Sequence, residues 1–170
     1  LFYTIANKSF NIAPYVNFVC PFSKERILRI DVWGNSQQPS PSQLQPIVDD
    51  ANPNHLRVGN PDLKQSFTTR FRLRYNDYNK VTQRTIVLNM GMNFKQNSIA
   101  NRTEYIEEGV QKTMPINVNG VCDGYFNFMY SMPLNPYFRL SSYTTGNYSR
   151  GISFLSDKDV LGEKSISNEM

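Results

Sequence analysis

The segment Phe67-Thr-Thr-Arg-Phe-Arg-Leu-Arg-Tyr75 decides the fold class of this chain, because its residues alternate in character. Its odd positions are mostly apolar, and its even positions carry Arg70, Arg72 and Arg74. Successive side chains of a β-strand point to opposite faces of a sheet. The segment therefore predicts a strand with one apolar face and one cationic face.

The same alternation recurs in five further segments, and helical periodicity is nearly absent. We expect strands at residues 11–22, 26–35, 84–102, 111–130 and 137–149, beside 67–75. Strands of roughly 10 to 20 residues are longer than the roughly 3 to 10 that are usual in soluble sheets. The sequence thus predicts an all-β, antiparallel, up-and-down sheet of about six strands.

The predicted connections alternate in length. Short turns are expected at 23–25, 76–83 and 131–136, and longer connections at 36–63, 103–110 and from 150 onward. Segment 36–63 is rich in Gln, Ser, Pro, Asn and Asp, so extended ladder pairing is not expected there. This asymmetry is typical of transmembrane barrels, which have short periplasmic turns and long extracellular loops.

Two arrangements satisfy the alternation. In a soluble sandwich the apolar face meets a second sheet, whereas in an outer-membrane barrel it meets lipid and the polar face lines the lumen. Strand length favours the barrel. Aromatic residues near the turns suit its interfacial girdle, although they also suit a core: Tyr75, Tyr78, Tyr130, Tyr137 and Phe138. About eight strands are the smallest barrel, so we expect part of a larger one.

Composition argues against several other classes of protein. The net charge of +4 is mild and the arginines are spread over strands, so no nucleic-acid partner is expected. Cys20 and Cys122 lack metal-ligand spacing and fall on apolar faces, where small buried or lipid-facing residues are expected and a disulfide is the less favoured alternative. We expect no metal and no cofactor.

Acidic residues in polar loops do not form a positioned acid–base pair. The candidates are Asp49 with Asp50, and Glu104 with Glu107 and Glu108. Catalysis needs two groups held in a defined geometry, and this spacing provides none. We therefore expect that the chain is not an enzyme.

Several motifs resemble a known family. They are Ser42-Gln-Leu-Gln-Pro46, Asn52-Pro53 and Arg57-Val-Gly-Asn-Pro-Asp-Leu-Lys64, leading into Phe67 and Leu73-Arg-Tyr-Asn76. Together they resemble the barrel of TonB-dependent outer-membrane receptors, in particular the outer-membrane β-barrel family common in Bacteroidetes-type bacteria. There, Gly-Asn-Pro-x-Leu ends an extracellular loop and starts a strand. The stretch from Asn76 to Arg84 resembles the periplasmic turn of that family.

The chain departs from the family pattern in one place and lacks other parts. Gln65-Ser66 follows Lys64 where the family usually has Pro-Glu, and the chain has no TonB-contacting box, plug domain or carboxy-terminal aromatic strand. The resemblance implies that residues 1–170 are a fragment of one outer-membrane β-barrel domain, with the plug and the remaining strands absent.

The resemblance also implies a function and partners. We expect a barrel-wall segment of a nutrient-uptake receptor in the bacterial outer membrane. Its partners would be outer-membrane lipid, the rest of its own barrel and plug, the TonB complex through the plug, and a surface lipoprotein. The alternative is a soluble all-β module that binds a ligand or carbohydrate, with Trp33 and tyrosines as stacking platforms.

The predicted site residues fall into two groups. Residues expected to face the lumen, where the arginines would bind acidic plug residues or anions, are Arg70, Arg72, Arg74, Asn89, Asn93, Asn117 and Asn119. His55 and Arg57, in segment 36–63, are expected to contact a ligand outside the membrane. Ordinary solvation and loop packing are the alternative for these two residues.

Overall fold

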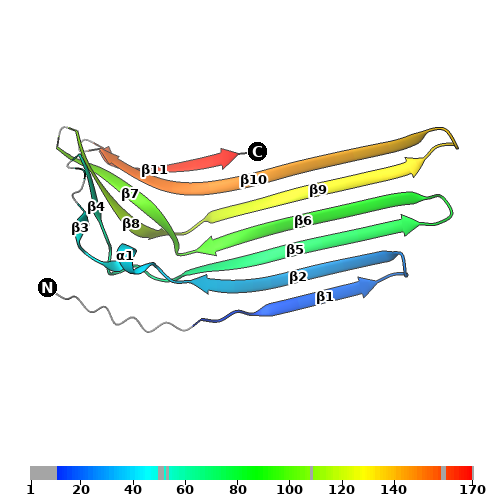
Figure 1. The fold of residues 1–170 in the computed structure, drawn as a ribbon, viewed down its shortest axis with the longest axis horizontal. Helices are drawn as coiled ribbons and strands as arrows, with labels where there is room; N and C mark the ends of the chain where they lie inside the picture. The colour runs from blue at the N-terminus through cyan, green and yellow to red at the C-terminus, as the bar shows by residue number, and fades with distance from the viewer. Residues whose placement is uncertain (1–10, 50–51, 53, 108, 158–159, 170) are drawn as a thin grey trace.

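Six long strands lie side by side in chain order and form most of the molecule (Figure 1). They are β1 (Tyr15–Pro21), β2 (Arg26–Gln37), β5 (Ser66–Asn79), β6 (Arg84–Gln96), β9 (Val121–Pro133) and β10 (Arg139–Asp157). The structure, a computed structural model, describes residues 11–49, 52, 54–107, 109–157 and 160–169. Each long strand pairs antiparallel with the next. The predicted all-β up-and-down sheet is confirmed.

Shorter elements gather at one end of the long sheet, opposite the short hairpin turns (Figure 1). They are α1 (Pro41–Leu44), β3 (Val48–Asp49), β4 (His55–Val58), β7 (Ser98–Glu107) and β8 (Val110–Val118). The last strand, β11 (Val160–Glu169), pairs antiparallel with the distal part of β10. Two short parallel pairings, β4 with β8 and β7 with β10, join the end elements to the same sheet.

The strand register places residues of like character next to one another. Phe71 lies between Val32 on β2 and Met92 on β6, and Met92 is followed by Gly124 on β9. On the opposite face Arg72 lies between Asp31 and Gly91. A slip of one residue would exchange the two faces, so the predicted facing within 67–75 agrees with this register.

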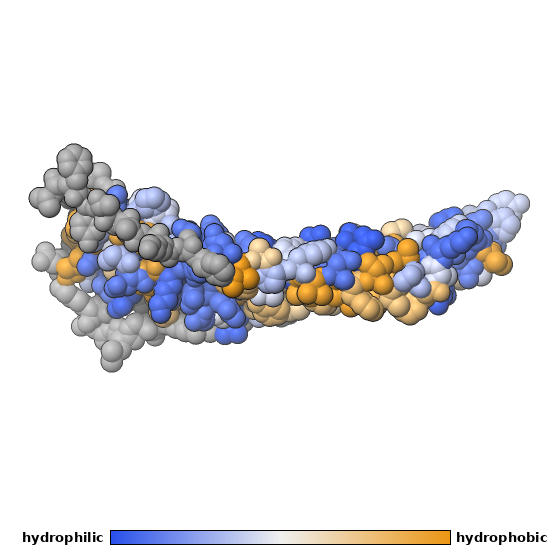
Figure 2. All heavy atoms as spheres, turned by 90° about the horizontal axis from the view of Figure 1, so that it is seen from below, coloured by the Kyte–Doolittle hydropathy of each residue, from blue (hydrophilic) through white to orange (hydrophobic). Residues whose placement is uncertain are grey.

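Seen from the side, the middle of the long sheet is hydrophilic on one face and hydrophobic on the other (Figure 2). The apolar face of the long strands includes these positions: Val16, Phe18, Cys20, Leu28, Ile30, Val32, Gly34, Phe67, Thr69, Phe71, Leu73, Tyr75, Ile86, Leu88, Met90, Met92, Phe94, Cys122, Gly124, Phe126, Phe128 and Tyr130. We call these positions the apolar band. None of them carries a charge, and on β10, which the band does not include, Arg150 pairs in register with Cys122 on the same face.

Two predicted strands are wrong as single elements. Segment 84–102 divides into β6 and β7 at Asn97, whose φ of 50° is in the left-handed region. Segment 111–130 divides into β8 and β9, and Gly120 in the break has a φ of 93°. Asn and Gly adopt this conformation most readily. The Asn119-Gly120 dipeptide is an ordinary turn signal, so the second break could have been predicted.

Four predicted connections also differ from the structure. Segment 36–63 contains α1, β3 and β4, although its ladder pairings are short. Segment 103–110 is mostly strand, because β7 runs to Glu107 before the reversal at Gly109, and from 150 onward β10 and β11 continue the sheet. The turn predicted at 76–83 is shorter, since β5 runs to Asn79. The alternation simply continues further than the strongest pattern indicated.

The apolar band is not covered by a second layer within the described part of the chain. All its strands belong to one sheet, and Phe18 remains 54% exposed and Phe94 46% exposed. A sandwich would bury these rings against an opposing sheet. The soluble-sandwich alternative therefore does not fit this architecture.

Both cysteines are free thiols on the apolar face. Cys20 lies on β1 and Cys122 on β9, with β2, β5 and β6 between them in the sheet. A disulfide requires Cα atoms less than about 7 Å apart, and strands are about 4.8 Å apart. This separation excludes a bridge between them.

Candidate functional site

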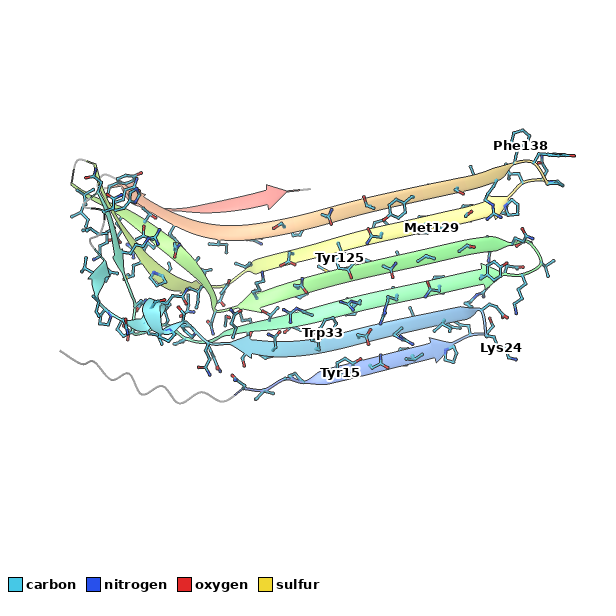
Figure 3. All side chains as sticks on the ribbon, in the orientation of Figure 1. Tyr15, Lys24, Trp33, Tyr125, Met129 and Phe138 are labelled. Carbon is cyan, nitrogen blue, oxygen red and sulfur yellow. The ribbon has the colours of Figure 1, made fainter. Side chains whose placement is uncertain are left out.

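Five of the predicted lumen-facing residues lie on the polar face of the long sheet. Arg70 pairs in register with Asn93, and Arg74 with Asn89, while Arg72 lies between these two pairs. The face continues onto β1 and β9, where Tyr15 and Tyr125 also lie, with Trp33 on β2 beside Tyr15 (Figure 3). The alternation that predicted these residues also brought them together.

Asp31 is the centre of a polar network on this face, and the sequence analysis did not select it. Its side chain is almost fully buried. It accepts hydrogen bonds from the Tyr15 hydroxyl at 2.9 Å, from Asn17 Nδ2 at 2.5 Å, and from Arg74 Nη2 at 3.0 Å. A buried carboxylate is costly unless it is paired in this way. Its position between Ile30 and Val32 was the available signal.

The other two arginines of β5 also have defined partners. The Arg72 guanidinium lies over the Trp33 ring, 5.0 Å from its centroid, and Arg70 donates to the side-chain oxygen of Asn35. The Trp33 ring therefore contacts the Arg72 guanidinium, whereas the alternative function, a carbohydrate-binding module, would have used this ring to stack on a sugar. These contacts hold the arginines in place, and the Arg74 side chain as a whole stays 38% exposed.

The polar face continues across β6 and β9. Asn93 donates to Asp123, and Lys95 forms an ion pair with the same carboxylate at 3.3 Å. On the same two strands, the Tyr125 ring of β9 covers Gly91 of β6, where an added Cβ would lie only 2.3 Å from a ring carbon. An aromatic residue over a strand glycine restores the contact surface that glycine lacks. The face is thus a continuous surface of paired polar groups.

Asn117 and Asn119 lie apart from this surface, at the junction between the long sheet and the β7–β8 hairpin. Asn117 Nδ2 donates to the carbonyls of Lys64 and Asn97, and its oxygen accepts from the Lys64 amide at 2.7 Å. Asn119 accepts from the Asn97 amide, also at 2.7 Å. Both side chains satisfy backbone groups where the strands break. Their facing toward a lumen stays a prediction.

The Gly-Asn-Pro-x-Leu motif has a clear local role. A Cβ on Gly59 would lie 2.0 Å from the Gln45 carbonyl oxygen, so only glycine allows this close approach. Asn60 donates from its side chain to the Pro115 carbonyl at 3.0 Å, and Leu63 is buried. The motif therefore fixes the loop that follows β2 against β8.

His55 and Arg57 line the same groove, of about 710 Å³, at the loop end of the sheet. Both are exposed on one face of β4, which pairs with β8. The other lining residues are Ser42, Gln43, Gln45, Ile47, Val58, Gly59, Asn101, Thr103, Gln111, Thr113 and Pro115. We call this the loop groove. Its volume is within the range of small-molecule sites.

The lining of the loop groove is rich in amides and hydroxyls. Among the described lining residues Arg57 is the cation, His55 is the histidine, and none is acidic. Amides and hydroxyls hydrogen-bond to polar ligands in either direction, and a guanidinium favours an anionic group. The groove therefore suits a hydroxyl-rich ligand that is neutral or carries a negative charge.

An ion pair joins the two turns at the opposite end of the sheet. Lys80 Nζ lies 2.6 Å from Glu25 Oε1, and the Tyr78 amide donates to the Glu25 carbonyl at 3.0 Å. The hydrogen bond from Lys80 lowers the pKa of Glu25 below its ordinary value, and the Glu25 carboxylate raises the pKa of Lys80. Opposite charges at this distance favour both charged forms.

The acidic residues considered for catalysis are described only in part. Glu104 forms an ion pair with Arg102 at 2.6 Å, while Asp50 and Glu108 lie outside the described residues. No group of three potential metal-binding side chains occurs among the described residues. In the same part of the chain, no helix is long and apolar enough to cross a membrane.

Comparison with known proteins gives one match. The model of the outer membrane protein beta-barrel family matches residues 3–169, nearly the whole chain. Neither the curated proteins nor the solved structures gave a match.

Proposed function

Because this chain belongs to the outer membrane protein beta-barrel family and lies in the bacterial outer membrane, we propose that it is a wall segment of a TonB-dependent receptor for nutrient uptake. In this proposal residues 1–170 are part of one larger barrel domain. Its partners are a plug and further strands of the same protein, the TonB complex through that plug, and a surface lipoprotein. Its role is transport, without catalysis.

The observation that carries the proposal is the contrast between the two faces of one sheet. The apolar band has no charged residue, whereas the opposite face holds the Asp31 network and Arg70, Arg72 and Arg74. Transmembrane barrels put an apolar band toward lipid and polar residues toward the lumen. In this proposal Phe71 faces lipid and the three arginines face the lumen.

The height of the apolar band supports this orientation. From Ile86 to Phe94 it extends about 26 Å along β6 at about 3.3 Å per residue. With a strand tilt of about 40°, it spans about 20 Å along the membrane normal, close to the roughly 25 Å of outer-membrane barrels. At the turn end of the band Tyr130 lies level with Ile86 on the same face and suits the interfacial girdle, whereas Tyr78 lies on the polar face.

The open edges of the sheet support the presence of further strands. Among the described strands β1 has a partner on one side only, and so has β10 from Arg139 to Tyr148. Backbone groups in the hydrocarbon must all be hydrogen-bonded within the protein. Other strands of the full-length barrel would satisfy them.

The loop groove gives this receptor a ligand contact. His55 and Arg57 lie at the end of the sheet with the long connections, which is the external end in a barrel of this kind. In this proposal they bind a polar nutrient, with Arg57 contacting an anionic or hydroxyl group. The amide and hydroxyl lining supports this ligand chemistry.

Thiol labelling of the full-length protein in outer-membrane vesicles tests the facing. In a background with Cys20→Ala and Cys122→Ala, we expect R72C to react with a membrane-impermeant thiol reagent, and F71C to react only with a lipid-soluble one. Reaction of F71C with the impermeant reagent, with R72C protected, would reverse the assignment.

Energy coupling needs a separate measurement. The full-length protein, solubilised from outer membranes, should bind the periplasmic domain of TonB in a pull-down assay. If the protein shows the expected labelling but does not bind TonB, the assignment as a TonB-dependent receptor is wrong and the assignment as a barrel wall remains.

A further inference from the structure

We propose that Arg26, Asp77 and Arg84 form a binding site for the phosphate of an anionic phospholipid, at the turn end of the lipid-facing surface. This inference rests on the proposed function, because it takes the apolar band as the face toward lipid. We call these three residues the basic cluster.

The basic cluster is held together by one buried carboxylate. Arg26 Nε lies 3.3 Å from Asp77 Oδ1, and Arg84 Nη2 lies 2.9 Å from Asp77 Oδ2. The Asp77 side chain is 6% exposed, whereas those of Arg26 and Arg84 are 46% and 32% exposed. Each guanidinium has five N–H donors and commits few of them to Asp77. The cluster keeps a net charge of +1, and the partly exposed side chains of Arg26 and Arg84 retain donors that Asp77 does not use; one of these, Arg84 Nε, is buried without a hydrogen-bond partner.

Strand parity puts the basic cluster on the apolar face. Arg26 lies in the same row as Leu28 and Ile30, and Arg84 in the same row as Ile86 and Leu88. Asp77 pairs in register with Arg26 and with Ile86. Arg84 is two residues further out and reaches Asp77 diagonally, which a long side chain can do between neighbouring strands. Arg26, Asp77 and Arg84 are therefore the charged residues that border the turn end of the apolar band on its own face.

The surroundings match the depth of lipid head groups. Ile86 pairs in register with Tyr130, so a tyrosine lies level with Asp77 on β9. Aromatic girdles mark the interface between hydrocarbon and head groups. A cavity of about 260 Å³ between the two turns is lined by Arg26, Asp77 and Tyr78 together with the Glu25–Lys80 pair. Lys80 and Glu25 neutralise each other in this cavity, as do Arg26 and Asp77, so the surplus positive charge of the basic cluster belongs to Arg84, beside the cavity.

These observations favour a lipid phosphate over a soluble anion. A soluble phosphate would be bound from water, whereas the basic cluster adjoins the apolar band, where acyl chains would lie beside Leu28 and Ile86. Arginine forks match phosphate geometry. A phospholipid satisfies both parts of this surface at once.

The test uses the full-length protein in nanodiscs of phosphatidylcholine with a minor fraction of phosphatidylglycerol. Native mass spectrometry measures the phosphatidylglycerol that the protein retains on release from the disc. We expect enrichment of this lipid by the wild type, and a loss of about fivefold in relative affinity for each arginine removed, as in R26Q and R84Q. R26K/R84K keeps the charges and should recover part of the enrichment.

The matched control removes two positive charges from the opposite face. R29Q/K95Q should retain phosphatidylglycerol as the wild type does, because Arg29 and Lys95 lie on the polar face. Equal losses in R26Q/R84Q and R29Q/K95Q would overturn the proposal in favour of a general charge effect. A wild type without enrichment would overturn it as well.

Two further outcomes separate the sources of failure. If inorganic phosphate, added to the mixed discs at the same concentration as phosphatidylglycerol, displaces the bound phosphatidylglycerol, the site is one for a free anion and the lipid assignment is wrong. If R72C and F71C label as expected while R26Q/R84Q has no effect, this inference fails and the proposed function remains. If F71C reacts with the impermeant reagent and R72C is protected, both the proposed function and this inference are wrong.

Discussion

Neighbouring residues of the long strands lie on opposite faces of the sheet, one apolar and one polar. Phe71 lies between Val32 and Met92 in the apolar band, whereas its neighbour Arg72 lies over Trp33 on the opposite face. A substitution at Phe71 and one at Arg72 therefore change opposite faces of the sheet, although the two residues are adjacent in the sequence.

We expect Phe71→Arg to destabilise the assembled full-length protein by about 2–4 kcal/mol, because it puts a charge near the middle of the hydrocarbon. Arg72→Ala should cost less than about 1 kcal/mol, the usual size of a partly exposed cation–π interaction. Urea-induced unfolding in lipid vesicles measures both. A larger loss for Arg72→Ala than for Phe71→Arg would contradict the facing.

At the scale of elements, the two turns at 22–25 and 80–83 behave as one unit. The Glu25–Lys80 ion pair links them through side chains, and the bond from the Tyr78 amide to the Glu25 carbonyl links them through the backbone. Neither bond joins residues that are neighbours in sequence. The turn residues were predictable, but this pairing between hairpins required the register of β2 with β5.

Lys80 lowers the pKa of Glu25 in the folded protein, so this pair makes stability depend on pH. A lowered carboxylate pKa contributes stability above the unfolded pKa and loses it as pH falls through the folded pKa. We expect the melting temperature of the wild type to exceed that of Lys80→Gln near neutral pH. The difference should shrink between about pH 5 and pH 3. Thermal melts of the full-length protein in detergent measure this.

Lys24→Gln is the control for this prediction, because Lys24 is in the same turn and the substitution leaves the Glu25–Lys80 pair intact. It should follow the wild type across the acid range. A difference between wild type and Lys80→Gln that stays constant from neutral to acid pH would show that Glu25 titration is not the cause.

At the scale of the whole molecule, the sheet leaves apolar side chains and backbone hydrogen-bonding groups without partners within the described part of the chain. Phe18, Phe94 and Phe138 are largely exposed, and the strand edges of β1 and β10 are open within the described part of the chain. Exposed edges and apolar faces lead to association in water.

We therefore expect residues 1–170, produced alone in buffer without detergent, to associate rather than to give a monomer with a cooperative melt. The same chain in detergent micelles should retain more β-structure and remain dispersed. Size-exclusion chromatography with light scattering and circular dichroism measures both states. A soluble monomer with a sharp melting transition would instead support an independent binding module.

The sequence by itself determined the faces, the long strands and most of the polar-face residues, because side-chain alternation is a local property of a strand. Arg70, Arg72, Arg74, Asn89 and Asn93 follow from parity alone. His55 and Arg57 were chosen only as polar loop residues, and their shared groove depends on the parallel pairing of β4 with β8. The strand breaks at Asn97 and Gly120 were missed, because apolar alternation continues on both sides of them.

Tertiary structure alone decided which polar groups meet. Asp31 receives Tyr15, Asn17 and Arg74 from two other strands, and Asp77 holds Arg26 and Arg84 on the opposite face. Such contacts depend on the register between strands that are distant in sequence, and register is fixed by the burial of whole rows of side chains. Parity assigns each residue of Phe67–Tyr75 to a face, and pairing with β2 and β6 gives each its neighbours.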